Sequence, residues 1–150
     1  MLKPSKKVAL AFEAVIDIAY HGGAEPVQSQ DIARRLGLPR RYLEQVLQQL
    51  VRCGVLKGVR GPRGGYELAR ERRRITAADI VRAAMTATGE DNLPPLPESR
   101  LVDEVVGPAV REASEAFLAE LEAYTVEMLC KQAEDGTVFG GMPSSADFAI

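Results

Sequence analysis

Residues 60–66 read Arg-Gly-Pro-Arg-Gly-Gly-Tyr, and this stretch decides the fold. Its three glycines allow positive φ and a close approach of backbone to a ligand, which is typical of a tight turn. The flanking segments, 55–59 and 66–68, have the pattern of two short strands. Two cations, Arg60 and Arg63, lie in the turn itself. We therefore expect a basic-tipped β-hairpin.

The segment just upstream, residues 40–50, has one apolar and one polar face at helical spacing. Two helices are expected before it: one runs from Ser5 to His21, and the other is capped by Ser29 and ended by Gly37. Three helices followed by a basic hairpin are typical of a winged helix-turn-helix. Double-stranded DNA is therefore the first partner to test.

Charge is distributed unevenly along the 150 residues. Through residue 74 there are 15 Lys and Arg against 7 Asp and Glu, a net of +8, and afterwards 4 against 14, a net of −10. The basic part coincides with the hairpin and the polar helix, which favours contact with a polyanion over simple solvation. Because neither a membrane-spanning apolar run nor a signal peptide is found, we expect a cytoplasmic protein with no membrane partner.

The residues after the hairpin complete the first domain. Thr76 is the expected N-cap of a fourth helix over Ala77–Met85, so the winged helix-turn-helix domain spans residues 1–85. Residues 86–100 are expected to form a proline-rich loop, because three prolines within positions 94–97 exclude helix.

A long helix is expected over residues 101–134, beginning or bending near Gly107-Pro108, with a flexible tail over residues 135–150. This helix is longer than a winged-helix core needs. Its apolar stripe therefore predicts self-association, and folding back on the first helix is the alternative. The expected dimerisation residues are Val106, Val110, Ala113, Phe117, Leu121, Tyr124 and Met128.

Three segments in this order and spacing carry a resemblance: Arg-Tyr-Leu-Glu-Gln at 41–45, Gly-Val-Leu at 54–56 and Val-Arg-Gly-Pro-Arg-Gly-Gly-Tyr at 59–66. Together with Asp-Ile-Ala at 31–33 and Ile-Thr-Ala-Ala-Asp-Ile at 75–80, they resemble the Rrf-two family of bacterial winged-helix transcription regulators. The family includes iron–sulfur, cysteine-metabolism and iron regulators.

The resemblance implies a homodimer held by crossed C-terminal helices and bound to promoter DNA. By position, Arg41, Glu44 and Gln45 read base edges and Arg60 enters the minor groove, whereas an ion pair with Arg40 or Arg41 is the alternative for Glu44. A phosphate contact is expected of Arg63. The full expected DNA-binding set is Ser29, Arg40, Arg41, Glu44, Gln45, Gln48, Arg60, Arg63, Gly64 and Gly65.

One departure from the family bears on cofactors. Cluster-binding members carry three cysteines between the fourth and the long helix, and residues 85–106 contain none. Thiolates are the usual ligands of such clusters, so we expect neither an iron–sulfur cluster at the family site nor any other metal or cofactor. Cys53 is expected to be buried, and Cys130 to be exposed and a possible redox residue.

These patterns predict a mostly α protein with a two-stranded wing that acts as a homodimeric, sequence-specific transcription regulator. Repression is the expected sign of regulation, and a small-molecule effector or partner protein is the expected signal. The alternatives are a winged-helix protein-interaction module and a redox- or iron-responsive regulator with non-standard ligands. An enzyme is not expected, because no nucleophile–base pair, metal set or phosphate loop is found.

Overall fold

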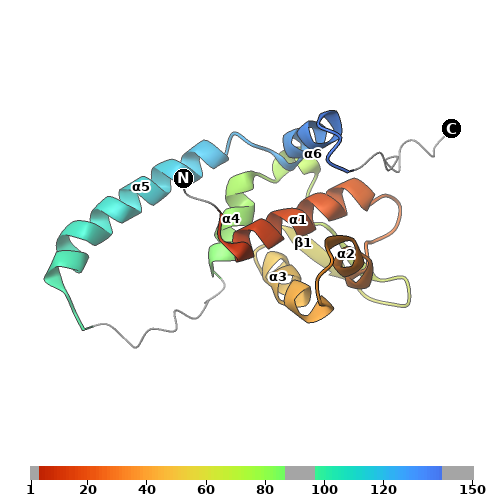
Figure 1. The fold of residues 1–150 in the computed structure, drawn as a ribbon, viewed down its shortest axis with the longest axis horizontal. Coiled ribbons are helices and arrows are strands. Elements are labelled where there is room, and N and C mark those ends of the chain that lie inside the picture. Colours follow the sequence, from red (N-terminus) through yellow and green to blue (C-terminus); the bar gives the residue numbers. More distant parts are fainter. Residues whose placement is uncertain (1–3, 87–96, 140–150) are drawn as a thin grey trace.

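The structure is a computed structural model that describes residues 4–86 and 97–139. The described elements, in chain order, are α1 (Lys6–His21), α2 (Ser29–Leu36), α3 (Arg40–Arg52), β1 (Leu56–Val59), β2 (Gly65–Leu68), the 3₁₀ turn η1 (Arg72–Arg74), α4 (Ala77–Thr86), the π-helical turn η2 (Val102–Val106), α5 (Gly107–Leu121) and α6 (Val126–Asp135). Figure 1 shows α1–α4, the hairpin and α6 gathered into one body, with α5 extending away from it. The expected mostly α fold with a two-stranded wing is confirmed.

Helix α1 runs through the centre of the body and packs against α2, α3, α4 and α6. Ser5 caps it as expected, accepting a hydrogen bond from the Val8 N–H at 3.2 Å. The expected apolar stripe is largely buried: Val15 and Ile18 are fully enclosed, whereas Val8 and Phe12 are partly exposed. Each fully buried aliphatic side chain of this kind stabilises the fold by about 1.5–3 kcal/mol.

The hairpin pairs β1 with β2 in antiparallel register, Leu56 opposite Leu68 and Val59 opposite Gly65. After it, Thr76 and Asp79 form a reciprocal cap at the start of α4. The Asp79 N–H donates to Thr76 Oγ1 at 3.2 Å, and the Thr76 N–H donates to Asp79 Oδ2 at 3.0 Å. The predicted start of the fourth helix is therefore confirmed.

The single helix expected over 101–134 is wrong, because the chain leaves the helix at Glu122 and starts α6 at Val126. Two hydrogen bonds to the start of α4 hold the break open: the Ala77 N–H donates to the Tyr124 carbonyl at 2.7 Å, and the Val126 N–H donates to the Ile75 carbonyl at 2.8 Å. Helix α6 then folds back on α1 and buries Val126 and Cys130. The alternative of folding back on the first helix therefore holds for α6.

Of the two expectations at Gly107-Pro108, a helix start or a bend, the start is confirmed, because α5 begins at Gly107. Proline has no N–H to donate into the preceding turn, and the chain accommodates it with η2, in which the Gly107 N–H reaches the Val102 carbonyl. Helix α5 begins immediately afterwards.

At Ser29 and in the C-terminal tail the structure differs from what was expected. Ser29 is not an N-cap: Gln28 takes that position, without a side-chain capping bond, and Ser29 is the first residue of α2. The tail expected to be flexible from residue 135 is folded through Phe139, whose ring stacks on Tyr20 with centroids 4.0 Å apart. Residues 140–150, and most of the expected proline-rich loop at 87–96, lie outside the described residues.

Candidate nucleic-acid interface

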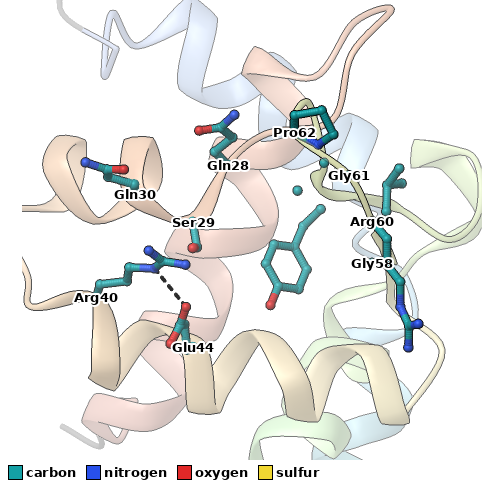
Figure 2. A pocket seen from close by; sticks show the side chains of 13 residues that line it. Gln28, Ser29, Gln30, Arg40, Glu44, Gly58, Arg60, Gly61 and Pro62 are labelled. Atoms are coloured by element: carbon teal, nitrogen blue, oxygen red, sulfur yellow. Dashed lines mark hydrogen bonds and ion pairs between the residues drawn. The ribbon is translucent and has the colours of Figure 1, made fainter.

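The starts of α2 and α3 and the hairpin surround one open cleft of about 560 Å³ (Figure 2). The cleft brings together six of the ten expected DNA-binding residues: Ser29, Arg40, Glu44, Arg60, Gly64 and Gly65. The sequence did not single out its other polar members, Gln28, Gln30 and Tyr66, for this role. Cations at two corners and backbone donors between them make this surface suitable for a polyanion.

Helix α3 presents its polar face beside the cleft. Arg40 Nε donates to Glu44 Oε1 at 2.8 Å, the dashed contact of Figure 2, so the alternative of an ion pair for Glu44 is observed. Arg41 lies 4.7 Å over the Tyr42 ring and donates to its hydroxyl at 2.9 Å. Both arginines are exposed, and so is Gln48.

Gln45 lies apart from the cleft. It lines two grooves on the other flank of α3, which it shares with Lys7 and Val46. Because Gln45 is still exposed near the start of α3, it can meet a ligand that reaches across the helix from the cleft side. A ligand that contacts all ten residues at once must therefore be wider than the cleft.

The hairpin turn is built as its glycines suggested. Among its three glycines only Gly61 has a positive φ, at 115°. The other two are needed for space, because a Cβ would lie 2.2 Å from the Val59 carbonyl oxygen at Gly64 and 2.4 Å from the Val27 carbonyl oxygen at Gly65. The turn places Arg60 and Arg63 in solvent, where Arg63 makes a loose ion pair of 3.4 Å with Glu25.

The hairpin is fixed to the segment that enters α2. The Val27 N–H donates to the Tyr66 carbonyl at 2.9 Å, and the Tyr66 N–H returns the bond to the Val27 carbonyl at 2.8 Å. This two-bond bridge leaves no room for a side chain at Gly65. The start of β2 and the segment that enters α2 are therefore held together.

Tyr66 contributes a hydroxyl to the cleft. Burial raises the pKa of this phenol, and the negative charge of Glu44 raises it further, although Arg40 acts in the opposite direction. The hydroxyl thus stays protonated at neutral pH and can donate a hydrogen bond to an acceptor in the cleft.

A buried ion pair sets the position of α2 on α1. Asp17 is 6% exposed, and Arg35 grips its carboxylate with two hydrogen bonds of 2.7 and 2.8 Å. The hydrogen bond to Asp17 raises the pKa of Arg35. Sequence reasoning missed this pair, although an acidic residue beside the apolar stripe of the first helix was a signal for it.

The expected dimerisation residues do not lie on one helix. Val106, Val110, Ala113 and Phe117 are exposed along η2 and α5, whereas Leu121 is half-buried at the end of α5. Tyr124 and Met128 lie beyond the break, with exposures of 38% and 44%. The apolar stripe of α5 itself therefore ends near Leu121.

The two cysteines are placed opposite to expectation. Cys53 is exposed at the C-terminal end of α3, and Cys130, on α6, is buried in the hydrophobic core. Burial raises the pKa of the Cys130 thiol, outweighing the lowering effect of Arg72. A raised pKa and burial both oppose the redox role proposed for Cys130.

The comparisons with known proteins agree with this architecture. Residues 4–132 match the family model Rrf2, described as an iron-dependent transcriptional regulator. The chain is similar to the HTH-type transcriptional regulator IscR of Xenorhabdus nematophila, with 38% identity over 82 residues, which cover 55% of this chain and 50% of that protein. The chain thus spans about half the length of the curated relatives it matches.

Two solved structures are similar over most of the chain. IscR of T. potens has a TM-score of 0.67 and 33% identity, covering 98% of this chain and 96% of its own. CymR, the global cysteine regulator of B. subtilis, has a TM-score of 0.63 and 30% identity, covering 88% and 98%.

The family description raises the question of iron, and the residues do not fit a thiolate-bound cluster. The whole sequence holds two cysteines and one histidine. One of the cysteines is buried with a raised pKa, and no group of three His, Cys, Asp or Glu within 4–86 and 97–139 is placed to hold a metal ion. Across these same ranges no helix has the length and apolar character to cross a membrane.

Proposed function

Because this chain belongs to the Rrf2 family of transcriptional regulators, we propose that it is a homodimeric, sequence-specific DNA-binding regulator of transcription. The observation that carries the proposal is the cleft between α3 and the hairpin, with Arg40 at one side and Arg60 at the other. Transcriptional regulation rather than catalysis is the activity of this family.

In this proposal α3 enters the major groove and the hairpin reaches the adjacent minor groove. Arg41 can pair with guanine, Glu44 can accept from cytosine N4, and Gln45 can bond adenine. Arg60, exposed at the hairpin tip, suits a narrow A·T-rich minor groove, where the potential is most negative. Gln48, one turn further along α3, extends the same face.

Dimerisation through α5 is the second part of the proposal. The exposed apolar side chains of η2 and α5 have no cover from the described part of the chain, and Phe117 alone is 57% exposed. A second copy that covers this stripe would bring two clefts onto one duplex. Dimeric helix-turn-helix proteins read paired half-sites in this way.

Repression at a promoter is the mode of action we propose, with a small-molecule effector or a partner protein as the signal. The segment 86–106, of which residues 87–96 lie outside the described residues, is the proposed receiver, because it joins the DNA-binding half to α5 and a change there would alter the spacing of the two clefts. The poor fit to a thiolate-bound cluster supports a signal other than such a cluster.

Selection of bound duplexes from a random-sequence pool tests the function directly. We expect a two-fold symmetric consensus whose binding weakens steeply as salt rises, because phosphate contacts release counterions. Arg60→Ala should lose affinity for every sequence, whereas Arg74→Ala, an exposed arginine on η1 outside the cleft, should not. Recovery of no consensus, with equal loss in both variants, would refute sequence-specific regulation through this cleft.

A further inference from the structure

The first turn of α2 has unused hydrogen-bond donors at the edge of the cleft. Its intrahelical bonds start with Asp31 and Ile32, which both donate to the Gln28 carbonyl, so the N–H groups of Ser29 and Gln30 precede the ladder. Gln28, the N-cap residue, makes no side-chain bond to these groups. A helix of eight residues therefore starts in the cleft with a partial positive charge and open donors.

The Ser29 side chain is an independent indication of a ligand. This residue is 7% exposed, and its hydroxyl forms no hydrogen bond with any group in residues 4–86 or 97–139. Since every fully enclosed polar side-chain atom in those ranges has a partner, the Ser29 hydroxyl must open onto the cleft. Figure 2 shows it turned toward the guanidinium of Arg40.

The charges around this corner suit an anion. Arg40 and Ser29 line the same cleft, and the two carboxylates nearby are already paired, Glu44 with Arg40 at 2.8 Å and Asp31 with Arg34 at 3.0 Å. The oxygens of one phosphate could accept hydrogen bonds from the N–H groups of Ser29 and Gln30 and from the Ser29 hydroxyl. Helix N-termini bind phosphate through this combination of free donors and dipole.

We propose that the corner formed by the Ser29 and Gln30 N–H groups and the Ser29 hydroxyl binds one phosphate of the DNA backbone. The inference rests on the proposed function, and it assigns to this corner a contact that sets position without reading sequence. The Val27–Tyr66 bridge joins the corner to the hairpin, so the bound phosphate also fixes how far Arg60 extends into the minor groove.

Neutralising single phosphates tests the assignment. In the selected duplex each phosphate near the half-site is replaced in turn by an uncharged methylphosphonate, and affinity is measured for wild type and Ser29→Ala. We expect one position where the replacement weakens wild type but has a smaller effect in Ser29→Ala, because the two changes remove the same contact. Ser29→Ala should weaken selected and unrelated duplexes alike, by about threefold to tenfold for one hydrogen bond.

A matched pair of isosteric substitutions separates binding from folding. Gln28→Glu puts a carboxylate beside the open donors, where it should leave the unfolding temperature unchanged or raise it through the helix dipole, while it weakens every duplex. Gln132→Glu makes the same charge change on an exposed part of α6 and should leave DNA binding at the wild-type level. Equal effects of the two variants on affinity would overturn the proposal.

These experiments distinguish failure of the proposed function from failure of the phosphate site alone. If wild type selects no sequence, the proposed function fails. If it selects one but no methylphosphonate is coupled to Ser29, the phosphate corner fails alone.

Discussion

The body made by α1–α4 and α6 buries most of its apolar side chains, whereas η2 and α5 leave most of theirs in solvent. Along α1, Val15 and Ile18 are enclosed on all sides; along α5, Val110 and Phe117 are 56% and 57% exposed. Both stripes have helical spacing, so their difference lies in what packs against them. The body is packed within one chain, whereas the apolar stripe of α5 has no cover within the described residues.

The two regions also differ in charge, and the difference suggests that they contact different kinds of partner. The cleft of the body has the exposed cations Arg40 and Arg60, whereas η2 and α5 carry mostly acidic charges, among them Asp103, Glu112 and Glu115. An acidic helix would be repelled by a duplex held in the cleft. Such repulsion would favour a position of α5 away from a duplex bound at the cleft.

The largest effect should come from a charge on the apolar stripe of α5. Phe117→Asp would bury an uncompensated carboxylate in the proposed interface, while the monomer fold should survive because Phe117 is exposed in the single chain. Sedimentation should show monomers, and operator affinity should fall by about 100-fold or more as two-site attachment is lost.

Val138→Asp is the control for this change, because Val138 is equally apolar and 71% exposed on the turn after α6. It should stay dimeric and bind the operator as wild type does. If Phe117→Asp sediments as a dimer, the apolar stripe of α5 has another use and the interface lies elsewhere.

Removal of Arg60 should have the next largest effect. Arg60→Ala removes a hairpin-tip cation that forms no ion pair within residues 4–86 and 97–139, and it should weaken all duplexes by about 10-fold or more, with a smaller salt dependence. It should also relax any preference for narrow A·T-rich minor grooves. Binding to duplexes of graded A·T content at several salt concentrations checks both effects, and a variant with unchanged salt dependence would remove Arg60 from the DNA contact.

Glu44→Ala should change the base preference of the protein more than its overall affinity for DNA. Loss of the carboxylate removes the acceptor for cytosine N4 and frees Arg40 from its 2.8 Å ion pair. We expect discrimination at one base pair per half-site to fall by about 1–3 kcal/mol, while binding elsewhere is retained. Glu13→Ala, an exposed acidic residue on α1, is the control. If the base preferences of the two variants match, the ion pair with Arg40 is the only role of Glu44.

The sequence predicted the features that depend on nearby residues and missed those that depend on contacts between distant segments. The caps at Ser5 and Thr76 and the turn at Gly61 depend on neighbours a few residues away, and they were predicted correctly. The break at Glu122–Thr125 was missed, because helix-forming residues lie on both sides and the bonds that hold it come from the start of α4. Thr125 does cap α6, accepting from the Met128 N–H at 3.2 Å, and this local signal was overlooked.

The burial of the two cysteines was predicted the wrong way round, and their reactivity is the test with the smallest expected effect. At neutral pH we expect alkylation of the native protein to modify the exposed Cys53 and to leave the buried Cys130 intact until the protein unfolds. Because the pKa of Cys130 is raised in the folded state, its contribution to stability is complete below its unfolded pKa of about 8.5 and declines as pH rises above that value. Mass spectrometry after brief iodoacetamide treatment would count the labels, with Cys53→Ser as the variant that should take up none. Rapid labelling of Cys130 in Cys53→Ser at neutral pH would mean that α6 opens away from α1, and that the body is less complete than its packing indicates.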